Sequence, residues 1–310
     1  MIRKDQLPNI WGDDFKAGSS SLQTTVAASG KPYKIVLHDK ESRNLLHLNT
    51  DSGYTPKEDE HDNLSFILEE GAELELYRIQ LKKCVRATNL EVIMKAGATL
   101  RLCTITLGGE HIRNNIVVRM QGEGSHLEAD GLYLVDREQE CDNYIFVEHA
   151  TPHCTSHELY KGIIDDAARA RFNGHVLVQD GAVKTEAYMT NRNILLTDKA
   201  HVDTRPFLEI YNDDVKCSHG STIGQLDKDA LFYLRSRGIP ERTAMMMLSY
   251  AFCDEVIRSI TIDSLRDTVG DMVKKRLHGE LMPPCEECAI QCTTPCNGPD
   301  ANFYIDPTKL

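Results

Sequence analysis

Short runs in which apolar and polar residues alternate fill the chain from residue 22 to residue 219. Successive side chains of a β-strand point to opposite faces, so alternation with a period of two predicts strands that bury one face. Glycine and acidic turn residues separate these runs. Apolar residues at three- and four-residue spacing are scarce in this part of the chain, which therefore predicts a mainly β structure.

One local pattern recurs along this part of the chain. A glycine or acidic turn, a small residue and then alternating apolar residues occur at residues 70–76 (EGAELEL) and 95–102 (KAGATLRL), and more loosely at 122–127. Later copies lie at 180–183 and 198–202. The first copies are about 26 residues apart and the last two about 18, which is near the coil length of a solenoid. The pattern favours a β-solenoid, with a β-sandwich as the alternative.

The pattern changes after Gly220. Asp227 is a suitable N-cap for a helix that continues to Arg235, and Gly238 can end this helix in the left-handed conformation. Pro240 suits the first turn of a second helix. The apolar positions of the second helix follow at steps of three and four residues: Met245, Leu248, Phe252 and Val256. This spacing predicts an amphipathic helix.

A third helix is predicted from Asp263 or Ser264, as its N-cap, to Leu277. Three such helices predict a small C-terminal helical domain. We therefore expect four parts: an N-terminal extension (1–21), a β-helix core (22–224), a helical domain (225–280) and a cysteine-rich tail (281–310).

Composition narrows the classes of partner. The formal net charge is −12, whereas binding to a nucleic-acid backbone requires clustered Lys and Arg. No run approaches the ~20 apolar residues that span a bilayer. The first residues lack the apolar core of a secretory signal. We expect a cytoplasmic protein that binds neither nucleic acid nor membrane.

Ten cysteines are present, and in a chain without an export signal we expect them to be thiols or metal ligands rather than disulfides. Four of them lie close together in the tail: Cys285, Cys288, Cys292 and Cys296. Four thiols at this spacing could close a tetrahedral zinc site or hold an iron–sulfur cluster. Their spacing differs from the common ferredoxin run, and reduced thiols or a redox pair are the alternative.

A second candidate site lies in the predicted strand around residue 217. Val215, Cys217 and His219 alternate onto one face, so that the thiol and the imidazole could reach the same ion. Thiolate is the usual ligand of iron–sulfur clusters, and histidine can replace it. The alternative is a buried cysteine beside a surface histidine.

A longer segment carries a family resemblance. Residues 202–227 are VDTRPFLEIYNDDVKCSHGSTIGQLD, and residues 231–239 continue as LFYLRSRGI. This segment closely resembles the signature of the SufB/SufD family of iron–sulfur cluster assembly scaffolds. Its Cys-Ser-His-Gly segment matches the SufD branch, because SufB has Glu-His-Glu there. The strong similarity extends from Val202 to Val256.

The resemblance implies a fold and a function. Members of the family form a right-handed parallel β-helix followed by a helical domain that docks on SufC, an ABC-type ATPase. The matching cysteine and histidine lie where two scaffold subunits meet, so Cys217 and His219 are expected to contact a nascent, transient iron–sulfur cluster. We expect SufC to contact the helical domain, at positions that include Phe232, Arg235, Met245, Leu248 and Phe252.

The sequence does not decide which scaffold subunit pairs with this chain. In SufB an assembly cysteine lies on the preceding coil, and the matching position is about Asn191, whose amide is a poor ligand for iron. The missing thiol comes from the partner if the chain pairs with SufB, and the site must be built otherwise in a homodimer. Strand patterning begins within about 25 residues of Met1, so we expect a short form without the N-terminal helical domain of longer members.

Two other functions compete with the scaffold. A β-helix polysaccharide lyase or hydrolase could use the acidic pairs Asp165–Asp166 or Asp213–Asp214, and a zinc-binding interaction protein could use the tail alone. The chain contains no Gly-x-x-x-x-Gly-Lys-Ser/Thr phosphate loop, so we expect no ATP hydrolysis by the chain itself. As a scaffold it is expected not to be an enzyme.

Overall fold

The computed structural model describes residues 22–25, 33–49, 61–81 and 86–278. Their strands form two sheets. Sheet A contains, in spatial order, β1 (Leu22–Thr25), β3 (Ser42–Asn49), β5 (Glu73–Gln80), β7 (Thr99–Thr106), β9 (His126–Val135), β11 (Thr155–Ile164), β13 (Glu186–Leu195) and β15 (Lys216–Gly224). Sheet B contains β14 (His201–Ile210), β12 (Arg169–Val178), β10 (Glu140–His149), β8 (His111–Met120), β6 (Arg86–Met94), β4 (His61–Leu68) and β2 (Tyr33–Leu37).

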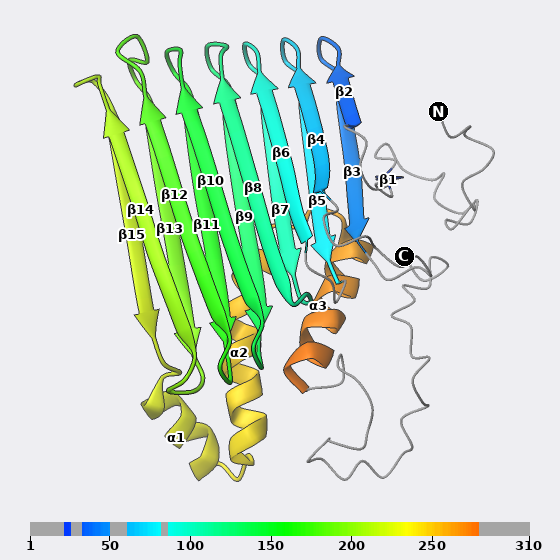
Figure 1. Cartoon of the computed structure of the whole chain (residues 1–310), viewed down its shortest axis with the longest axis vertical. Coiled ribbons are helices and arrows are strands. Elements are labelled where there is room, and N and C mark those ends of the chain that lie inside the picture. Colours follow the sequence, from blue (N-terminus) through cyan, green and yellow to red (C-terminus); the bar gives the residue numbers. More distant parts are fainter. Residues whose placement is uncertain (1–21, 26–32, 50–60, 82–85, 279–310) are drawn as a thin grey trace, which may run out of the picture.

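Odd-numbered and even-numbered strands belong to different sheets, so the chain changes sheet at every turn and returns one coil later. Neighbouring strands are parallel in both sheets. Figure 1 shows the two stacks of strands lying face to face, with the helices at the C-terminal end of the chain. The predicted parallel β-helix with a small C-terminal helical part is therefore confirmed, and a sandwich of antiparallel sheets is excluded.

Tight turns from sheet B to sheet A give the coils their regular spacing. One residue of each of the first six such turns has φ between +57° and +71°: Lys40, Gly71, Gly97, Gly124, His153 and Lys184. The backbone N–H of each donates to a carbonyl in the turn of the following coil at 2.7–3.1 Å. Glycine adopts this conformation without steric cost, which explains why the recurring glycine at residues 71, 97 and 124 was visible in the sequence.

The last two copies of the sequence pattern are not one coil apart, unlike the first copies. Residues 180–183 lie in the turn between β12 and β13, whereas residues 198–202 span the opposite corner, from the turn after β13 into the start of β14. Their spacing of about 18 residues therefore joins two corners of one coil rather than two coils. The true coil length near the C-terminal end is seen in the strand register, which pairs Ala187 with Cys217.

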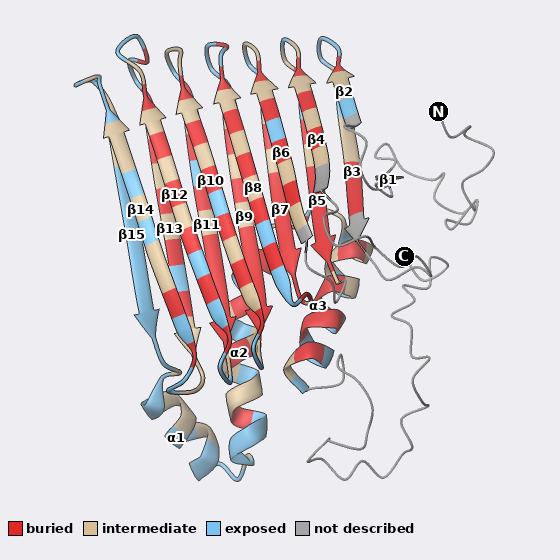
Figure 2. Cartoon of the chain, in the orientation of Figure 1, coloured by how far each residue is buried: buried red, intermediate tan, exposed pale blue. Residues whose placement is uncertain are grey.

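The space between the two sheets, here called the lumen, is filled with side chains. Aliphatic residues from both sheets stack in columns along most of it, and the largest fully buried side chains include Tyr133, Tyr160, Phe66 and Phe172. Burial of this apolar surface is the main driving force for folding. Figure 2 shows the buried residues alternating with partly exposed ones along most strands, as the period of two requires.

Three helices follow β15: α1 (Lys228–Ser236), α2 (Glu241–Ile257) and α3 (Asp263–His278). Asp227 caps α1, because its carboxylate accepts hydrogen bonds from the backbone N–H groups of Asp229 (2.9 Å) and Ala230 (3.1 Å). Gly238 follows with φ of +85°. The predicted N-cap and the predicted left-handed glycine are both confirmed.

Helices α2 and α3 cover the outer face of sheet A. A second apolar cluster joins them to the sheet, and its helical members include Cys253, Val256, Ile257, Leu265, Val269 and Val273. Lys161 of β11, whose side chain is only 4% exposed, forms an ion pair with Glu255. Its Nζ also donates to the carbonyl of Phe252 at 2.9 Å. Sheet A therefore has a covered outer face.

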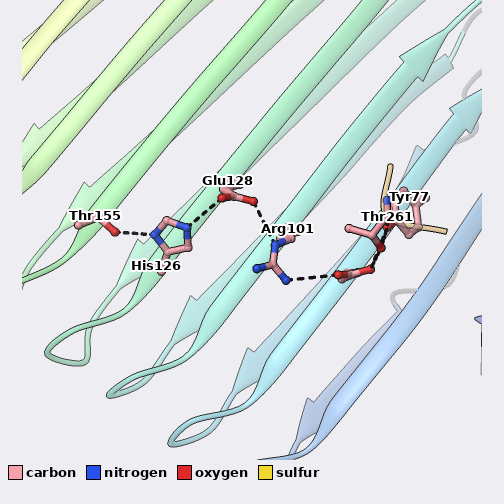
Figure 3. A network of polar contacts seen from close by, with 7 residues as sticks. Tyr77, Arg101, His126, Glu128, Thr155 and Thr261 are labelled. Carbon is pink, nitrogen blue, oxygen red and sulfur yellow. Dashed lines mark hydrogen bonds and ion pairs between the residues drawn. The ribbon is translucent and has the colours of Figure 1, made fainter. Parts of the chain in front are cut away.

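A chain of polar contacts fixes the corner between α2 and α3 to sheet A (Figure 3). The hydroxyl of Tyr77 lies 3.0 Å from the hydroxyl of Thr261 and donates to Glu75 at 2.8 Å. Arg101 then bridges Glu75 (3.3 Å) and Glu128 (3.1 Å) on neighbouring strands. These contacts hold the helices at one position on the solenoid.

Candidate functional site

The C-terminal end of the solenoid presents two strands that each lack a neighbouring strand on one side among the described residues. β14 ends sheet B, and β15 ends sheet A. Figure 2 shows β15 as largely exposed, in contrast to the strands further along sheet A, which carry many buried residues. Large apolar side chains are also exposed here, among them Phe207 (55%), Tyr211 (58%) and Ile223 (50%). Unpaired backbone groups beside exposed apolar side chains favour association with another chain.

The backbone of β15 is arranged for such pairing. The N–H of Lys216 donates to the carbonyl of Thr185 at 2.8 Å, so the even-numbered residues of β15 bond to the turn and strand before it. In a parallel sheet the N–H and C=O of one residue point to the same side. The odd-numbered residues of β15 therefore direct their backbone groups to the open edge: Cys217, His219, Ser221 and Ile223.

Cys217 and His219 share the lumen side of β15. They lie in register with Ala187 and Met189 of β13, both of which are buried in the lumen core. Cys217 is half-buried and packs against that core, whereas His219 is exposed. The predicted alternation of the two side chains onto one face is confirmed, and it places them at the mouth of the lumen.

The environment of Cys217 keeps its thiol protonated. Burial raises the pKa of Cys217 above its ordinary value, the backbone of Ala187 lowers it in part, and the charge of Glu158 raises it further when that carboxyl is ionised. A thiol binds a metal ion as thiolate, so a cation that binds here must displace the proton.

The mouth is closed partly by a contact between the two sheets. The hydroxyl of Ser221 in β15 donates to the hydroxyl of Thr204 in β14 at 2.9 Å. Among the described residues, no group of three His, Cys, Asp or Glu side chains is arranged to hold a metal ion. The described chain therefore offers only a thiol and an imidazole here, and a metal ion at this place would need further ligands from another molecule or from a bound inorganic group.

Asn191 lies one coil before β15, on the same side of the sheet as Ser221. It is fully buried, and its amide nitrogen donates to the Tyr133 hydroxyl and the Tyr160 carbonyl, both at 3.1 Å. Its amide oxygen accepts from Asn193 at 2.7 Å. The amide is thus used inside the lumen and is not a further ligand at the mouth.

The residues expected to contact an ATPase separate into two groups. Phe232 is 73% exposed, and Arg235 is exposed beside Glu241 at 3.3 Å. Met245 and Leu248 of α2 are half-buried. Phe252 faces the solenoid instead, because its ring lies 4.7 Å from the Lys161 ammonium and it packs against the apolar cluster between helices and sheet.

The two acidic pairs of the polysaccharide lyase alternative lie in turns between strands, where their carboxylates make local contacts. Asp166 accepts from the backbone N–H of Arg137 at 3.0 Å, and Asp214 forms an ion pair with Lys184 at 2.7 Å. The four tail cysteines lie outside the described residues, and the zinc or cluster site predicted for them stays a prediction.

Sequence analysis missed a polar group inside the lumen. Glu158 of β11 is 2% exposed, and it shares the buried face of its strand with Ser156 and Tyr160. The sequence signal that could have indicated Glu158 is a strand with polar residues at two successive positions of one face. That signal requires knowing which face is inside.

The fold and the site define a class: a parallel β-solenoid that offers a thiol and an imidazole at an open strand edge. The family model described as "SUF system FeS cluster assembly, SufBD core domain" matches residues 29–252. The chain belongs to this family of iron–sulfur cluster assembly proteins.

Individual relatives agree with the family match. The chain is 40% identical over 189 residues to the iron–sulfur cluster assembly protein SufD of Escherichia coli (strain K12), covering 61% of this chain and 45% of that protein. It is 37% identical over 226 residues to a SufBD family protein of Mycobacterium leprae, covering 70% and 58%. A chloroplastic protein of Arabidopsis thaliana is 34% identical over 186 residues, covering 59% and 39%. The chain thus matches about half the length of these relatives.

No helix in the described part of the chain is long and apolar enough to cross a bilayer.

Proposed function

We propose that this chain is a scaffold subunit of a Suf-type iron–sulfur cluster assembly complex, in which Cys217 and His219 contact the nascent cluster. The position of these two side chains on the lumen side of an unpaired edge strand is the observation that carries the proposal. The iron and sulfide are cargo in this role rather than a resident cofactor. Thiolate and imidazole are both established ligands of such clusters.

A second scaffold subunit supplies the remaining ligands in this proposal. The open edge of β15 offers the backbone groups of four residues for pairing, which suits addition of a partner strand. The edge of β14 is less regular, because its even-numbered residues face outward and Pro206, in the middle of them, has no N–H. Gly220, in the middle of β15, has nothing within 4 Å of its Cβ position, which leaves room for a close backbone approach. The partner is a second copy of the chain or a SufB-like scaffold, and the experiment below separates them.

The ATPase partner contacts α1 and the exposed part of α2 in this proposal. Helix α1 has no buried residue, and Phe232 and Tyr233 expose 73% and 57% of their surface. A large exposed aromatic patch on a short helix is typical of a docking surface. ATP hydrolysis belongs to this SufC-type partner, and the chain itself acts as a non-catalytic scaffold. Phe252 is partly buried against sheet A, so the proposed docking surface is centred on α1 rather than on Phe252.

Anaerobic purification of the full chain with its native partners tests the proposal. We expect an ABC-type ATPase and a scaffold subunit to co-purify, with iron and acid-labile sulfide in the complex. Mass spectrometry of the complex distinguishes two copies of this chain from one copy beside a SufB-like chain.

Point variants then test whether Cys217 and His219 hold the iron and sulfide. His219→Ala and Cys217→Ser are expected to remove most of the iron and sulfide while the complex still assembles. Ser218→Ala, on the opposite face of the same strand, is the matched control and should retain both. Equal iron and sulfide in all three variants would refute the role of the pair, and release of uronate from polysaccharide by the chain would favour the lyase instead.

A further inference from the structure

A buried carboxyl lies inside the lumen close to the proposed site. Glu158 of β11 is 2% exposed. Neither of its carboxyl oxygens makes a hydrogen bond of normal geometry among the described residues, and the nearby Ser156 hydroxyl offsets its burial only in part. Ser156, two residues earlier on the same face, has its hydroxyl 3.0 Å from Nε2 of His149. Leaving a polar group buried without a partner costs free energy, so its retention calls for a role beyond packing.

Glu158 is placed under the mouth of the lumen. It lies in register with Met189 of β13, and Met189 in turn lies in register with His219. In the neighbouring column Ser156, Ala187 and Cys217 follow the same order. Adjacent strands are about 4.8 Å apart, so the backbone of Glu158 is about 10 Å below that of His219. The intervening side chain beside Cys217 is the small Ala187.

The surroundings hold Glu158 in its neutral form. Burial raises the pKa of Glu158 to about 8. The other titratable groups that face this part of the lumen are Tyr133 from β9, His149 and Cys141 from β10, Cys154 just before β11, Tyr160 from β11, and Cys217 and His219 from β15. Burial lowers the pKa of His149 to about 4 and raises the pKa of Cys141 to about 12. Both are thus uncharged at pH 7, and neither supplies a cation for Glu158.

A cation at the mouth of the lumen would lower the pKa of Glu158. A unit charge about 10 Å away in a protein interior shifts the pKa of a carboxyl by roughly one unit. A divalent metal ion bound to the thiolate of Cys217 and the imidazole of His219 adds one net positive charge. The arrival of the metal therefore favours loss of the proton from Glu158.

We propose that Glu158 is a positioning residue that stores a proton in the empty scaffold and becomes the internal counter-charge when a divalent metal ion binds at Cys217 and His219. This inference rests on the function proposed above. In the binding step the S–H bond of Cys217 breaks as the sulfur–metal bond forms, and the O–H bond of Glu158 breaks. Both protons go to solvent, and no atom is oxidised or reduced. The carboxylate then holds the metal by electrostatic attraction from below, without direct contact.

Titration of the full chain with Co²⁺ under anaerobic conditions at pH 7 tests the inference. Every protein in this experiment, the reference chain included, carries Cys285→Ser, Cys288→Ser, Cys292→Ser and Cys296→Ser, so that the tail thiols add no absorption. Thiolate-to-cobalt charge-transfer absorption reports binding at Cys217, and calorimetry in two buffers of different ionisation enthalpy counts the released protons. We expect Glu158→Gln to release about half a proton fewer than the unmodified chain and to bind Co²⁺ about twofold more weakly, because a shift of roughly one unit from a pKa of about 8 ionises only about half of the Glu158 carboxyl at pH 7. Glu128→Gln, on the outer face of the same sheet, is the matched control and should leave both quantities unchanged.

The outcomes separate the two proposals. Equal proton release by the unmodified chain and Glu158→Gln, with circular dichroism showing both folded, overturns the role of Glu158 and leaves the scaffold function standing. Co²⁺ absorption that is absent, or that persists in Cys217→Ser, overturns the metal site itself and with it the counter-charge. Glutamine has nearly the same shape as glutamate, so the variant removes the proton without leaving a cavity.

Discussion

The ring of Tyr160 lies directly over Gly131, its register partner on the neighbouring strand of sheet A. A Cβ atom on Gly131 would lie 2.3 Å from Cδ1 of that ring. The reciprocal contact is present one position further along, where a Cβ on Gly162 would lie 2.2 Å from the ring of Tyr133. Each glycine thus leaves the space that a tyrosine ring fills, and the two rings pack the lumen between consecutive coils.

Gly131→Ala is expected to destabilise the protein by about 1–3 kcal/mol, because a methyl group cannot enter this space without displacing the buried Tyr160 ring. Urea denaturation followed by circular dichroism measures the change. Gly181→Ala is the control, since nothing lies within 4 Å of its Cβ position, and it should change the free energy of unfolding by less than about 0.5 kcal/mol. Equal stability of the two variants would contradict the packing described here.

Lys161 is expected to hold α2 on sheet A. Lys161→Ala removes a buried ammonium that bonds the Phe252 carbonyl and pairs with Glu255, so we expect a loss of about 1–3 kcal/mol. Hydrogen exchange should become faster in α2 before it does in the strands. Arg192→Ala, which removes a half-exposed partner 3.6 Å from Glu255, serves for comparison. Unchanged exchange in α2 would show that the apolar cluster alone is sufficient.

The buried Glu158 predicts a pH dependence of stability. Its pKa is raised by burial from 4.5 to about 8 in the folded protein, so the folded state keeps a proton that the unfolded state has lost. The free energy of unfolding should therefore fall as pH rises through this window, by at most about 1.4 kcal/mol per pH unit from this group.

Glu158→Gln removes that contribution. Between pH 5.5 and 7.5 the unmodified chain should lose about 2–3 kcal/mol relative to the variant in urea denaturation. Other titrating groups, including His149, are present in both proteins and cancel in the difference. Parallel pH profiles for the two proteins would mean that Glu158 is ionised in the folded state.

Phe232→Ala is expected to weaken binding of the SufC-type ATPase by at least tenfold, because truncating a central aromatic side chain of an interface commonly costs more than 1.4 kcal/mol. Its thermal stability should be unchanged, since the ring is 73% exposed. Tyr144→Ala, on the uncovered outer face of sheet B, is the matched control for an exposed aromatic residue. A pull-down in which both variants retain the ATPase equally would move the docking surface away from α1.

Point variants test this surface better than removal of the whole helical part. Helices α2 and α3 bury an apolar face of sheet A, so a chain that ends after Gly224 would expose that face to water. Loss of ATPase binding by the shortened chain would then have two causes. Retention of the ATPase by the shortened chain would still exclude the helices as the binding site.

Much of the fold was predictable because it depends on local chemistry. Alternation with a period of two identified the strands, and recurring turn glycines at residues 71, 97 and 124 indicated coils. Asp227 and Gly238 marked the ends of the first helix correctly, since N-caps and left-handed glycines are set by backbone geometry over a few residues. The family segment around Cys217 and His219 named the candidate site.

Other features depended on how the coils stack. A period of two shows that Cys217 and His219 share a face but not that this face is the lumen side, because either face of a strand can be inside. The burial of Glu158, the use of Asn191 inside the lumen and the turning of Phe252 toward Lys161 all follow from register between distant strands. The sequence alone thus determined the strands, the helix ends and the chemical candidates. Only the tertiary structure decided which side chains lose contact with water, because burial is created by neighbours that are about 30 or more residues away along the chain.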